Sequence, residues 1–230
     1  MLLIVAGAGM SVDSGLPDFR GNDGLWIHYP ALPKGQMDFS SIASPQAFRD
    51  HPRLAWGFYE HRRYLYAKTA PHAGYAALRD YASTLPGEAF VFTSNVDGHF
   101  LKAGLRDDQV YEVHGTIHHW QCLDDCEGDL WAAPERLMPV DVARCQLLGE
   151  LPRCRHCGQL VRPNILMFGD SGWQERRSLR QEKAYEAWLD EPGRLVILEV
   201  GAGLAVPTCR YESERHGVPI IRVSLRYADL

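Results

Sequence analysis

The sequence predicts an α/β fold: a parallel sheet with helices on both faces, and a small metal-stapled lobe inserted into the chain. Three observations predict it. Short apolar runs alternate with segments of helical pattern, the first run leads directly into glycines, and four cysteines gather in two close pairs. Strands of a parallel sheet are expected to be unbroken apolar runs, because helices cover both of its faces.

Four segments are expected to form the parallel strands. They are residues 2–5, 89–93, 195–200 and 219–223. Their alternation with helical patterns favours parallel pairing. The first run ends in Gly7-Ala8-Gly9, so we expect the fold to open on its central strand.

Capping signals mark three of the expected helices. Ser44-Pro45 places a cap and a first-turn proline before a helix that extends through Phe48 to Tyr59. Pro71 opens a second helix, and Pro207 opens a third that stops at Gly217.

Length and composition narrow the class of protein. The chain has 230 residues, of which 46% are hydrophobic and 23% charged, as in an ordinary globular protein, so we expect one domain or one domain with an inserted lobe. Twenty-four Lys and Arg against 29 Asp and Glu leave a net charge of −5, and no basic tail is present. We therefore expect no nucleic-acid ligand.

The start of the chain does not predict a membrane segment. The uncharged apolar stretch 1–9 is too short to cross a bilayer and lacks the cationic lead of a secretory signal. We expect a cytoplasmic protein with no membrane partner.

The cysteine spacing predicts a metal site. Cys122 and Cys126 form a C-x-x-x-C pair, and Cys154 and Cys157 form a C-x-x-C pair. Two such pairs supply four thiolates to one tetrahedral ion and leave no coordination position open. Thiolates select zinc, so a structural zinc site is expected, in a reducing compartment.

Other ligand sets remain open at this stage. Cys145, His118, His119 or His156 could replace one cysteine, and four thiols without a metal are the alternative. The surrounding stretch is rich in Gly and Pro and has few long apolar runs. We expect residues 116–162 to form the inserted zinc-binding lobe, and residues 1–115 with 163–230 to form the main domain.

The glycines after the first strand predict a nucleotide-binding turn. Glycine lets the backbone approach a pyrophosphate, whose charge is met by amide hydrogens at a helix N-terminus. Val12 stands where the usual third glycine would be, and a tight turn in any α/β protein is the alternative.

Several motifs, in the same order, resemble the sirtuins, the NAD-dependent protein lysine deacylases. The segment 7–21 reads G-A-G-x-S-x-x-S-G-x-P-D-F-R-G, and residues 93–98 are similar to the family's T-Q-N-I-D motif. Val113-His114-Gly115 resembles its catalytic histidine segment, and residues 162–170 resemble R-P-x-V-V-x-F-G-E. The resemblance covers nearly the whole chain, and it implies a Rossmann-like NAD-binding domain beside the zinc lobe.

The resemblance also implies an activity. Sirtuins transfer an acyl group from lysine to ADP-ribose and release nicotinamide, with a histidine as the base that acts on a ribose hydroxyl. His114 would be that base, since imidazole titrates near neutrality, and Asn95 the second catalytic residue. For His114 the alternative is a structural hydrogen-bonding role.

The resemblance implies a set of NAD-binding residues. They are Gly7, Ala8, Gly9, Ser11, Asp18, Phe19, Arg20, Ser94, Asn95, Asp97, Gly201, Ala202, Gly203 and Ser224. Asn95 would bind ribose hydroxyls or a water, and Asp97 the nicotinamide carboxamide; the alternatives are a turn cap and an N-cap for residues 98–103. Phe19 would shield the ribosyl centre and Arg20 would lie near the phosphates, whereas a Pro-Asp turn with a solvated arginine is the alternative for that loop.

For the acyl-lysine protein or peptide substrate, the resemblance implies two further groups. Phe168 and Gly169 lie where the family adds the peptide as an extra strand, through contacts that are mostly blind to peptide sequence. Tyr59 and Arg62 form a Y-x-x-R pair similar to the one with which some sirtuins hold succinyl- or malonyl-lysine. A solvated charged helix face is the alternative for this pair.

Some positions depart from the family pattern, and they keep other functions open. Ala6, Ser94, 201–203 and Ser224 stand where sirtuins carry Thr, Gln, G-T-S and Asn. Lost hydrogen bonds there would weaken NAD binding by about 1 kcal/mol each. An NAD glycohydrolase or ADP-ribosyltransferase is therefore the alternative enzyme, and an NAD-binding module without catalysis is the other alternative.

Overall fold

A computed structural model describes residues 1–17, 29, 32, 37–86, 89–124, 126 and 129–225. Asp18, Phe19 and Arg20 lie outside the described residues. The chain divides into two compact units. The sheet unit contains Met1–Leu16, Thr69–His114 and Glu175–Leu230, and the cysteine unit contains Pro17–Lys68 and Gly115–Gln174.

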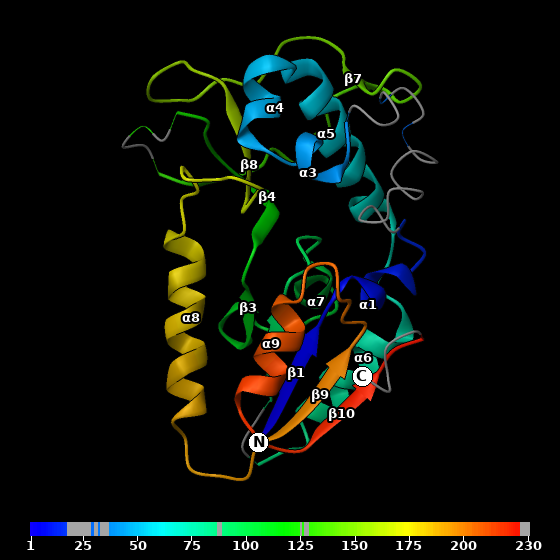
Figure 1. Cartoon of the computed structure of the whole chain (residues 1–230), viewed down its shortest axis with the longest axis vertical. Coiled ribbons are helices and arrows are strands. Elements are labelled where there is room, and N and C mark those ends of the chain that lie inside the picture. The colour runs from blue at the N-terminus through cyan, green and yellow to red at the C-terminus, as the bar shows by residue number, and fades with distance from the viewer. Residues whose placement is uncertain are drawn as a thin grey trace. The chain divides into compact units, whose positions relative to one another are not determined.

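The sheet unit is built on a five-stranded parallel sheet with the order β10-β9-β1-β2-β3 (Figure 1). The strands are β1 (Leu2–Ala6), β2 (Ala89–Thr93), β3 (Val110–Glu112), β9 (Val196–Val200) and β10 (Ile220–Val223). Leu3 lies opposite both Phe90 and Ile197, so β1 is the central strand, as predicted. The four predicted strands are confirmed. β3 was not predicted, because three residues are too few to make an apolar pattern.

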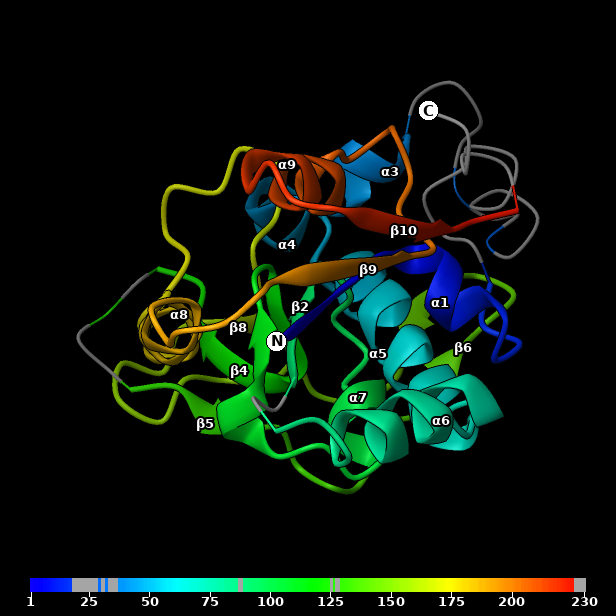
Figure 2. The same ribbon diagram turned by 90° about the horizontal axis from the view of Figure 1, so that it is seen from below.

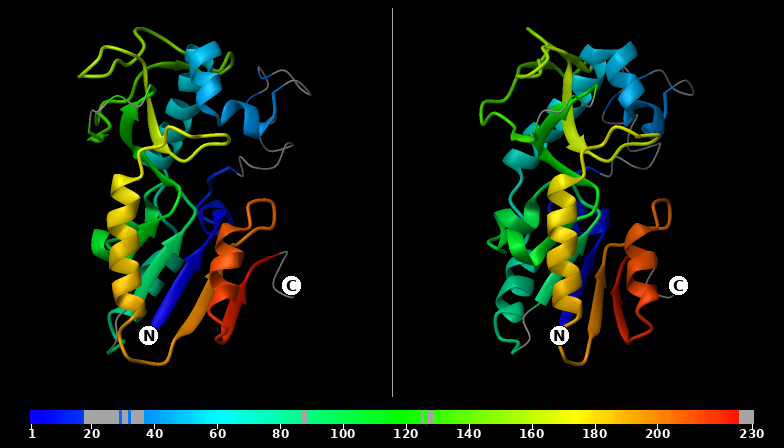
Figure 3. Two further views of the ribbon diagram at one scale, coloured as in Figure 1. Left: turned by 60° about the vertical axis from the view of Figure 1, so that its left-hand side comes forward. Right: turned by 90° about the vertical axis from the view of Figure 1, so that its left-hand side faces the viewer.

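Alternate residues of β1 pack against helices on the two faces of this sheet. Leu2 and Ile4 pack with Tyr75 of α6 (Ala73–Ala82) and Phe100 of α7 (His99–Lys102). Leu3 packs with residues of α8 (Arg176–Leu189) and α9 (Thr208–Arg215). Figure 2 shows α9 on one side of the strands and α6 and α7 on the other, and in the right-hand view of Figure 3 α8 lies in front of the strands with α9 beside them. The predicted α/β fold is confirmed.

The helix boundaries of the sheet unit follow local capping. The Nδ1 atom of His72 accepts the Gly74 N–H at 3.0 Å, which caps α6 two residues after Pro71. α9 begins directly after Pro207 and stops before Gly217, which has a φ of +61°. The short helix α1 (Ala8–Val12) follows Gly7, and the 3₁₀ turn η1 (Asp107–Gln109) precedes β3.

The cysteine unit combines helices with antiparallel strands. Its strands are β4 (Gly115–Cys122), β5 (Trp131–Ala132) and β8 (Val161–Ile165), in the order β5-β4-β8, and the separate pair β6 (Val140–Asp141) and β7 (Gln146–Leu147). Its helices are α3 (Phe39–Ile42), α4 (Pro45–Asp50) and α5 (Pro52–Lys68). The expected lobe, residues 116–162, lies within this unit, which also takes in residues 17–68.

One helix expected from the sequence is interrupted. The Ser44 side chain caps α4 by accepting the Ala47 N–H at 3.2 Å, as predicted, but α4 ends at Asp50. His51 has a φ of −133° and a ψ of +57°, because a residue before proline is pushed out of the helical region, and Pro52 starts α5. Within the described part of the chain, no helix has the length and apolar character to cross a membrane.

Candidate functional site

The turns that follow β1 and β9 touch through their backbones. Gly7 N donates to Val200 O at 2.9 Å, and Gly9 N donates to Gly201 O at 3.0 Å. A Cβ atom on Gly7 would lie 2.6 Å from the Gly201 oxygen, and one on Gly9 would lie 2.7 Å from the Gly201 Cα. These glycines are therefore required for packing between the two turns, whether or not a ligand binds there.

The same turns leave amide hydrogens for a ligand. Among the described residues, no acceptor is found for the backbone N–H of Ala8, Ala202 or Gly203. Ala202 is only 2% exposed, so an unsatisfied amide there is costly. These three amides lie beyond the carboxyl ends of the parallel strands, where open α/β sheets bind nucleotides. This arrangement fits a pyrophosphate.

A buried polar cluster lies beyond the carboxyl ends of β1 and β2. The hydroxyl of Ser11 donates to Asp97 Oδ2 at 2.5 Å, and the side-chain amide of Asn95 donates to Ser11 Oγ at 3.0 Å and to Gly7 O at 2.9 Å. Asp97 Oδ1 accepts the His99 N–H at 2.8 Å. Asp97 thus caps the start of α7 and binds Ser11 at the same time.

The hydrogen bonds of Asn95 determine which atom it can offer to a ligand. Both hydrogens of its side-chain nitrogen are used. Gly7 O is an acceptor only, and the one hydroxyl hydrogen of Ser11 is already donated in the hydrogen bond to Asp97. Within the described residues no donor reaches Asn95 Oδ1. Asn95 therefore presents an acceptor, which suits a ribose hydroxyl or a water.

Asn95 and His114 follow the ends of two adjacent strands. Thr93 pairs with Glu112 across β2 and β3, and each of the two residues lies two positions beyond that pair. The ring of His114 is half-buried, and its Nε2 atom is 3.3 Å from the hydroxyl of Thr208. An imidazole and an amide oxygen thus follow adjacent strand ends.

Ser94 faces α9. Its hydroxyl accepts from the Cys209 thiol at 3.3 Å, and the same thiol lies 3.2 Å from Ala6 O. The backbone N–H of Ser94 donates to Ala6 O at 3.2 Å. Two of the positions that depart from the family pattern, Ala6 and Ser94, are thus bound to the first turn of α9. Ser224 follows β10 at the same edge of the sheet.

Three residues near this cluster were not predicted from the sequence: Tyr75, Thr208 and Glu112. Tyr75 and Thr208 come from helices, and no local pattern marks them. Glu112 lies two residues before His114 and could have been noticed there. Its carboxylate, 2% exposed, accepts from Arg177 Nη1 at 2.6 Å. Burial raises the pKa of Glu112 to about 7, although Arg177 opposes the rise.

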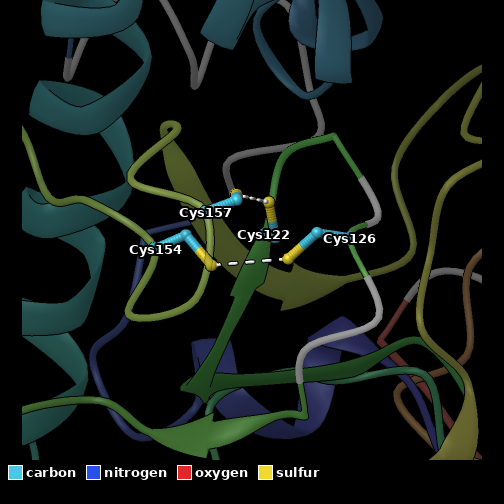
Figure 4. A group of neighbouring side chains, drawn as sticks. All are labelled: Cys122, Cys126, Cys154 and Cys157. Carbon is cyan, nitrogen blue, oxygen red and sulfur yellow. Dashed lines mark hydrogen bonds between the residues drawn. The ribbon is translucent and has the colours of Figure 1, made fainter.

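The cysteine unit brings the four paired cysteines together (Figure 4). Their Sγ atoms all lie within 4.8 Å of one another, with 3.5 Å between Cys122 and Cys157 and between Cys126 and Cys154. Backbone N–H groups of Cys157 and His156 lower the pKa of Cys154 to about 7 against the opposing effect of burial. Four convergent thiols fit one tetrahedral zinc ion.

The other candidate ligands are not part of this cluster. His118, His119 and His156 lie outside it. Cys145 is buried and its Sγ is 3.8 Å from Leu54 O, and burial raises the pKa of its thiol to about 12. The ligand set predicted from spacing is therefore the one that converges in the structure.

Tyr59 and Arg62 lie on α5 and are both buried. The guanidinium of Arg62 donates to the Tyr66 hydroxyl through Nε at 3.0 Å and Nη2 at 2.5 Å. It lies between 5.4 and 5.6 Å from the ring centres of Phe58, Tyr59 and Tyr66. This is not a solvated charged face, because Arg62 is only 8% exposed.

Phe168 and Gly169 lie on a loop held by a buried ion pair. Arg162 binds both oxygens of Asp170 at 2.7 and 2.8 Å, and neither side chain is exposed. Asp170 also accepts the Met167 N–H at 3.2 Å. Phe168 is 44% exposed and Gly169 has a φ of +64°. The ion pair thus supports a loop that exposes an apolar side chain.

Comparisons with a family model, with known sequences and with solved structures all find similarity to the same family. The family model described as the Sir2 family matches residues 7–191. NAD-dependent protein deacylase 1 of Pseudomonas aeruginosa is 32% identical over 227 residues, which are 97% of this chain and 82% of that protein. An NAD-dependent protein deacylase of Aquifex aeolicus is 29% identical over 225 residues, with the same coverage. The crystal structure of a Sir2 homolog–NAD complex is 25% identical, with a TM-score of 0.69, and the match covers 97% of this chain and 77% of that one.

Proposed function

Because this chain belongs to the Sir2 family, we propose that it is an NAD-dependent protein lysine deacylase that transfers the acyl group to ADP-ribose and releases nicotinamide. The observation that carries the proposal is the placement of His114 and Asn95, which follow two adjacent strand ends in a unit whose turns keep amides unsatisfied. A protein that only binds a nucleotide does not need a general base such as His114 next to the ribose.

The polar groups of the two turns and of the buried cluster each have a role in this proposal. The amides of Ala8, Ala202 and Gly203 hold the pyrophosphate, and Asn95 Oδ1 accepts from a ribose hydroxyl. Bound NAD would supply the electrophilic ribose carbon that loses nicotinamide and, on the same ribose, the hydroxyl to which the acyl group is finally attached. His114 takes the proton of a ribose hydroxyl, which an imidazole does near neutral pH. Asp97 keeps Ser11 and the start of α7 in place and receives the nicotinamide carboxamide.

The four cysteines hold a structural zinc ion in this proposal. With four thiolates no coordination position is left for substrate, so the ion stabilises the cysteine unit and takes no part in the chemistry. The cysteines must stay reduced to bind zinc, which requires a reducing compartment, so we propose that the protein is cytoplasmic.

A net charge of −5 agrees with a protein or peptide substrate and not with nucleic acid.

The substrate is an acyl-lysine protein or peptide. The Phe168 N–H already donates to Ala43 O at 2.9 Å, so Phe168 would offer its carbonyl, and Gly169 its backbone groups, for pairing with an extended peptide. Tyr59 and Arg62 are the candidates for contact with the acyl group. A guanidinium buried among aromatic rings favours a carboxylate, because charge-assisted hydrogen bonds are strong where water is excluded. We therefore propose that the enzyme accepts succinyl-lysine as well as acetyl-lysine.

An NAD glycohydrolase or ADP-ribosyltransferase on the same scaffold is the second candidate. It is favoured by Ser94, whose hydroxyl is bound by Cys209, and by the replacement of polar side chains at residues 201–203. These changes alter the groups available to NAD while His114 and Asn95 are kept.

One experiment separates the two candidates. The zinc-loaded protein is incubated with NAD and with acetyl-, succinyl- and longer acyl-lysine peptides, and the products are identified by mass spectrometry. We expect O-acyl-ADP-ribose, and its loss in His114→Ala. ADP-ribose formed without any peptide would instead establish the glycohydrolase. Deacylation that survives in His114→Ala would overturn the assignment of the base.

A further inference from the structure

Tyr75 of α6 places a hydroxyl against the polar cluster from the core of the sheet unit. Its side chain is fully buried, with ring centres 4.8 Å from Phe100, 5.7 Å from His99 and 5.0 Å from His72. Its hydroxyl oxygen lies 3.3 Å from Ser11 Oγ. An aromatic ring packed on three sides cannot swing away, so the position of this hydroxyl is set by the core.

The direction of the hydrogen bond between Tyr75 and Ser11 follows from counting protons. Ser11 has one hydroxyl proton, which it donates to the Asp97 carboxylate at 2.5 Å. The oxygen of Ser11 can then only accept from its other partners, which are the side-chain amide of Asn95 and the Tyr75 hydroxyl. Burial and the nearby Asp97 carboxylate raise the pKa of Tyr75, so the phenol keeps its proton and donates it.

Ser11 is therefore the central member of the cluster, and Tyr75 is one of two donors that hold it. The Asn95 amide uses one hydrogen on Ser11 and the other on Gly7 O. The geometry of Ser11 thus decides how Asn95 is turned and where its Oδ1 atom points. Donation from the Tyr75 hydroxyl to Ser11 strengthens the bond from Ser11 to Asp97, because hydrogen bonds in a chain polarise one another.

We propose that Tyr75 is a positioning residue for NAD, acting through Ser11 to hold the carbonyl oxygen of Asn95 toward the ribose. The proposal rests on the proposed function, in that NAD is the ligand. Tyr75 does not touch the ligand. It contacts Ser11 from α6, and its contribution passes through the Ser11 hydroxyl.

Tyr75→Phe tests this proposal with little change of packing, because the ring is kept. Tyr185 provides a matched control in the same unit. It is 1% exposed on the other face of the sheet, and its hydroxyl donates to Glu212 and lies 3.2 Å from His216 Nε2. Both variants remove one buried phenol hydroxyl, so both are expected to lower the melting temperature. Only Tyr75→Phe is expected to change NAD binding.

The first measurement is the Kd for NAD by calorimetry on the zinc-loaded protein without peptide. We expect Tyr75→Phe to raise this Kd about five-fold, as for the loss of one neutral hydrogen bond, and Tyr185→Phe to leave it unchanged. In a Ser11→Ala background, Tyr75→Phe should have no further effect, because its route to Asn95 is already cut. An unchanged Kd in Tyr75→Phe, an equal rise in Tyr185→Phe, or a full additional rise in the Ser11→Ala background would overturn the proposal.

A second measurement does not depend on NAD. The side-chain amide of Asn95 gives a pair of NMR resonances, and we expect their hydrogens to exchange faster with solvent in Tyr75→Phe than in Tyr185→Phe. Equal exchange in the two variants would overturn the role of Tyr75. Absence of O-acyl-ADP-ribose from the unmodified protein would count against the proposed function and would leave both measurements interpretable.

Discussion

The Nε2 atom of His114 lies 3.3 Å from the hydroxyl oxygen of Thr208, the first residue of α9. The proposed base therefore has a partner from another part of the chain. The Sγ atom of the next residue, Cys209, lies 3.2 Å from Ala6 O, so this turn of α9 packs against the central strand. Thr208 thus limits the orientations open to the imidazole.

Removal of the Thr208 hydroxyl should slow deacylation. Thr208→Val keeps the shape of the side chain and removes the polar contact, and we expect kcat to fall about three- to ten-fold, equivalent to roughly 1 kcal/mol. Thr208→Ser restores a hydroxyl and should recover most of the rate. The measurement is steady-state kinetics at saturating NAD and peptide. A valine variant as fast as the unmodified protein would show that Thr208 does not orient His114.

Because of Glu112, the free energy of unfolding should decrease as the pH rises toward neutrality. Its pKa is about 7 in the folded protein against an ordinary 4.5, so between these values the folded state binds a proton that the unfolded state has lost. Stability is then highest below about pH 5 for this group and decreases, by on the order of 1–3 kcal/mol, up to about pH 7.

The check is urea unfolding of the unmodified protein and of Glu112→Gln between pH 5 and 8. Glutamine cannot titrate and keeps an acceptor for Arg177, so the decrease should be smaller in this variant. Parallel pH profiles for the two proteins would exclude Glu112 as the cause.

Loss of one paired cysteine should release the metal and unfold the cysteine unit. Cys154→Ser removes a thiolate from a set whose sulfurs lie within 4.8 Å of one another. Since binding of structural zinc contributes directly to folding, we expect less than one zinc per chain and a large loss of melting temperature. Cys145→Ser is the matched control, because Cys145 is a buried thiol outside the cluster. Equal metal loss in both variants would contradict the assigned ligands.

Arg62 should matter more for acidic acyl groups than for acetyl. Arg62→Met keeps an apolar stem among the rings of Phe58, Tyr59 and Tyr66 but removes the charge. We expect kcat/KM for a succinyl-lysine peptide to fall at least ten-fold more than for the acetyl peptide, in line with the loss of a charge-assisted hydrogen bond. Tyr66→Phe removes one acceptor of Arg62 and keeps the charge of Arg62, and should cost less. Equal losses on both peptides in Arg62→Met would remove Arg62 from acyl selection.

Breaking the ion pair beneath the Phe168 loop should weaken peptide binding. Asp170→Asn leaves Arg162 buried without its carboxylate, which costs about 3–5 kcal/mol of stability when one partner of a buried pair is removed. We expect the KM for peptide to rise while the Kd for NAD stays unchanged, because NAD is assigned to the other unit. Asp108→Asn, in an exposed pair with Arg106, is the control. If both variants behave alike, the ion pair does not support the loop.

The predictions that the structure confirms concern features set by residues close together in the chain. The strand segments around Leu3, Phe90 and Ile197 were predicted, because an apolar run is visible in the sequence itself. The gathering of the four paired cysteines was predicted from their spacing, since two close pairs of thiols suffice for one ion, but the exclusion of Cys145 and the nearby histidines came from the structure. The break at His51 had a local signal in Pro52, but helical periodicity continues across it and hid the boundary.

By itself, the sequence determined the α/β class, the central first strand, the cysteine set and the motifs around His114 and Asn95, because each depends on residues close together in the chain. Only the tertiary structure decided what surrounds them. Tyr75 reaches Ser11 across 64 residues and Thr208 reaches His114 across 94. Such contacts leave no periodic trace in the sequence, since they depend on how strands and helices separated along the chain pack together. The direction in which Asn95 offers its oxygen follows from those contacts.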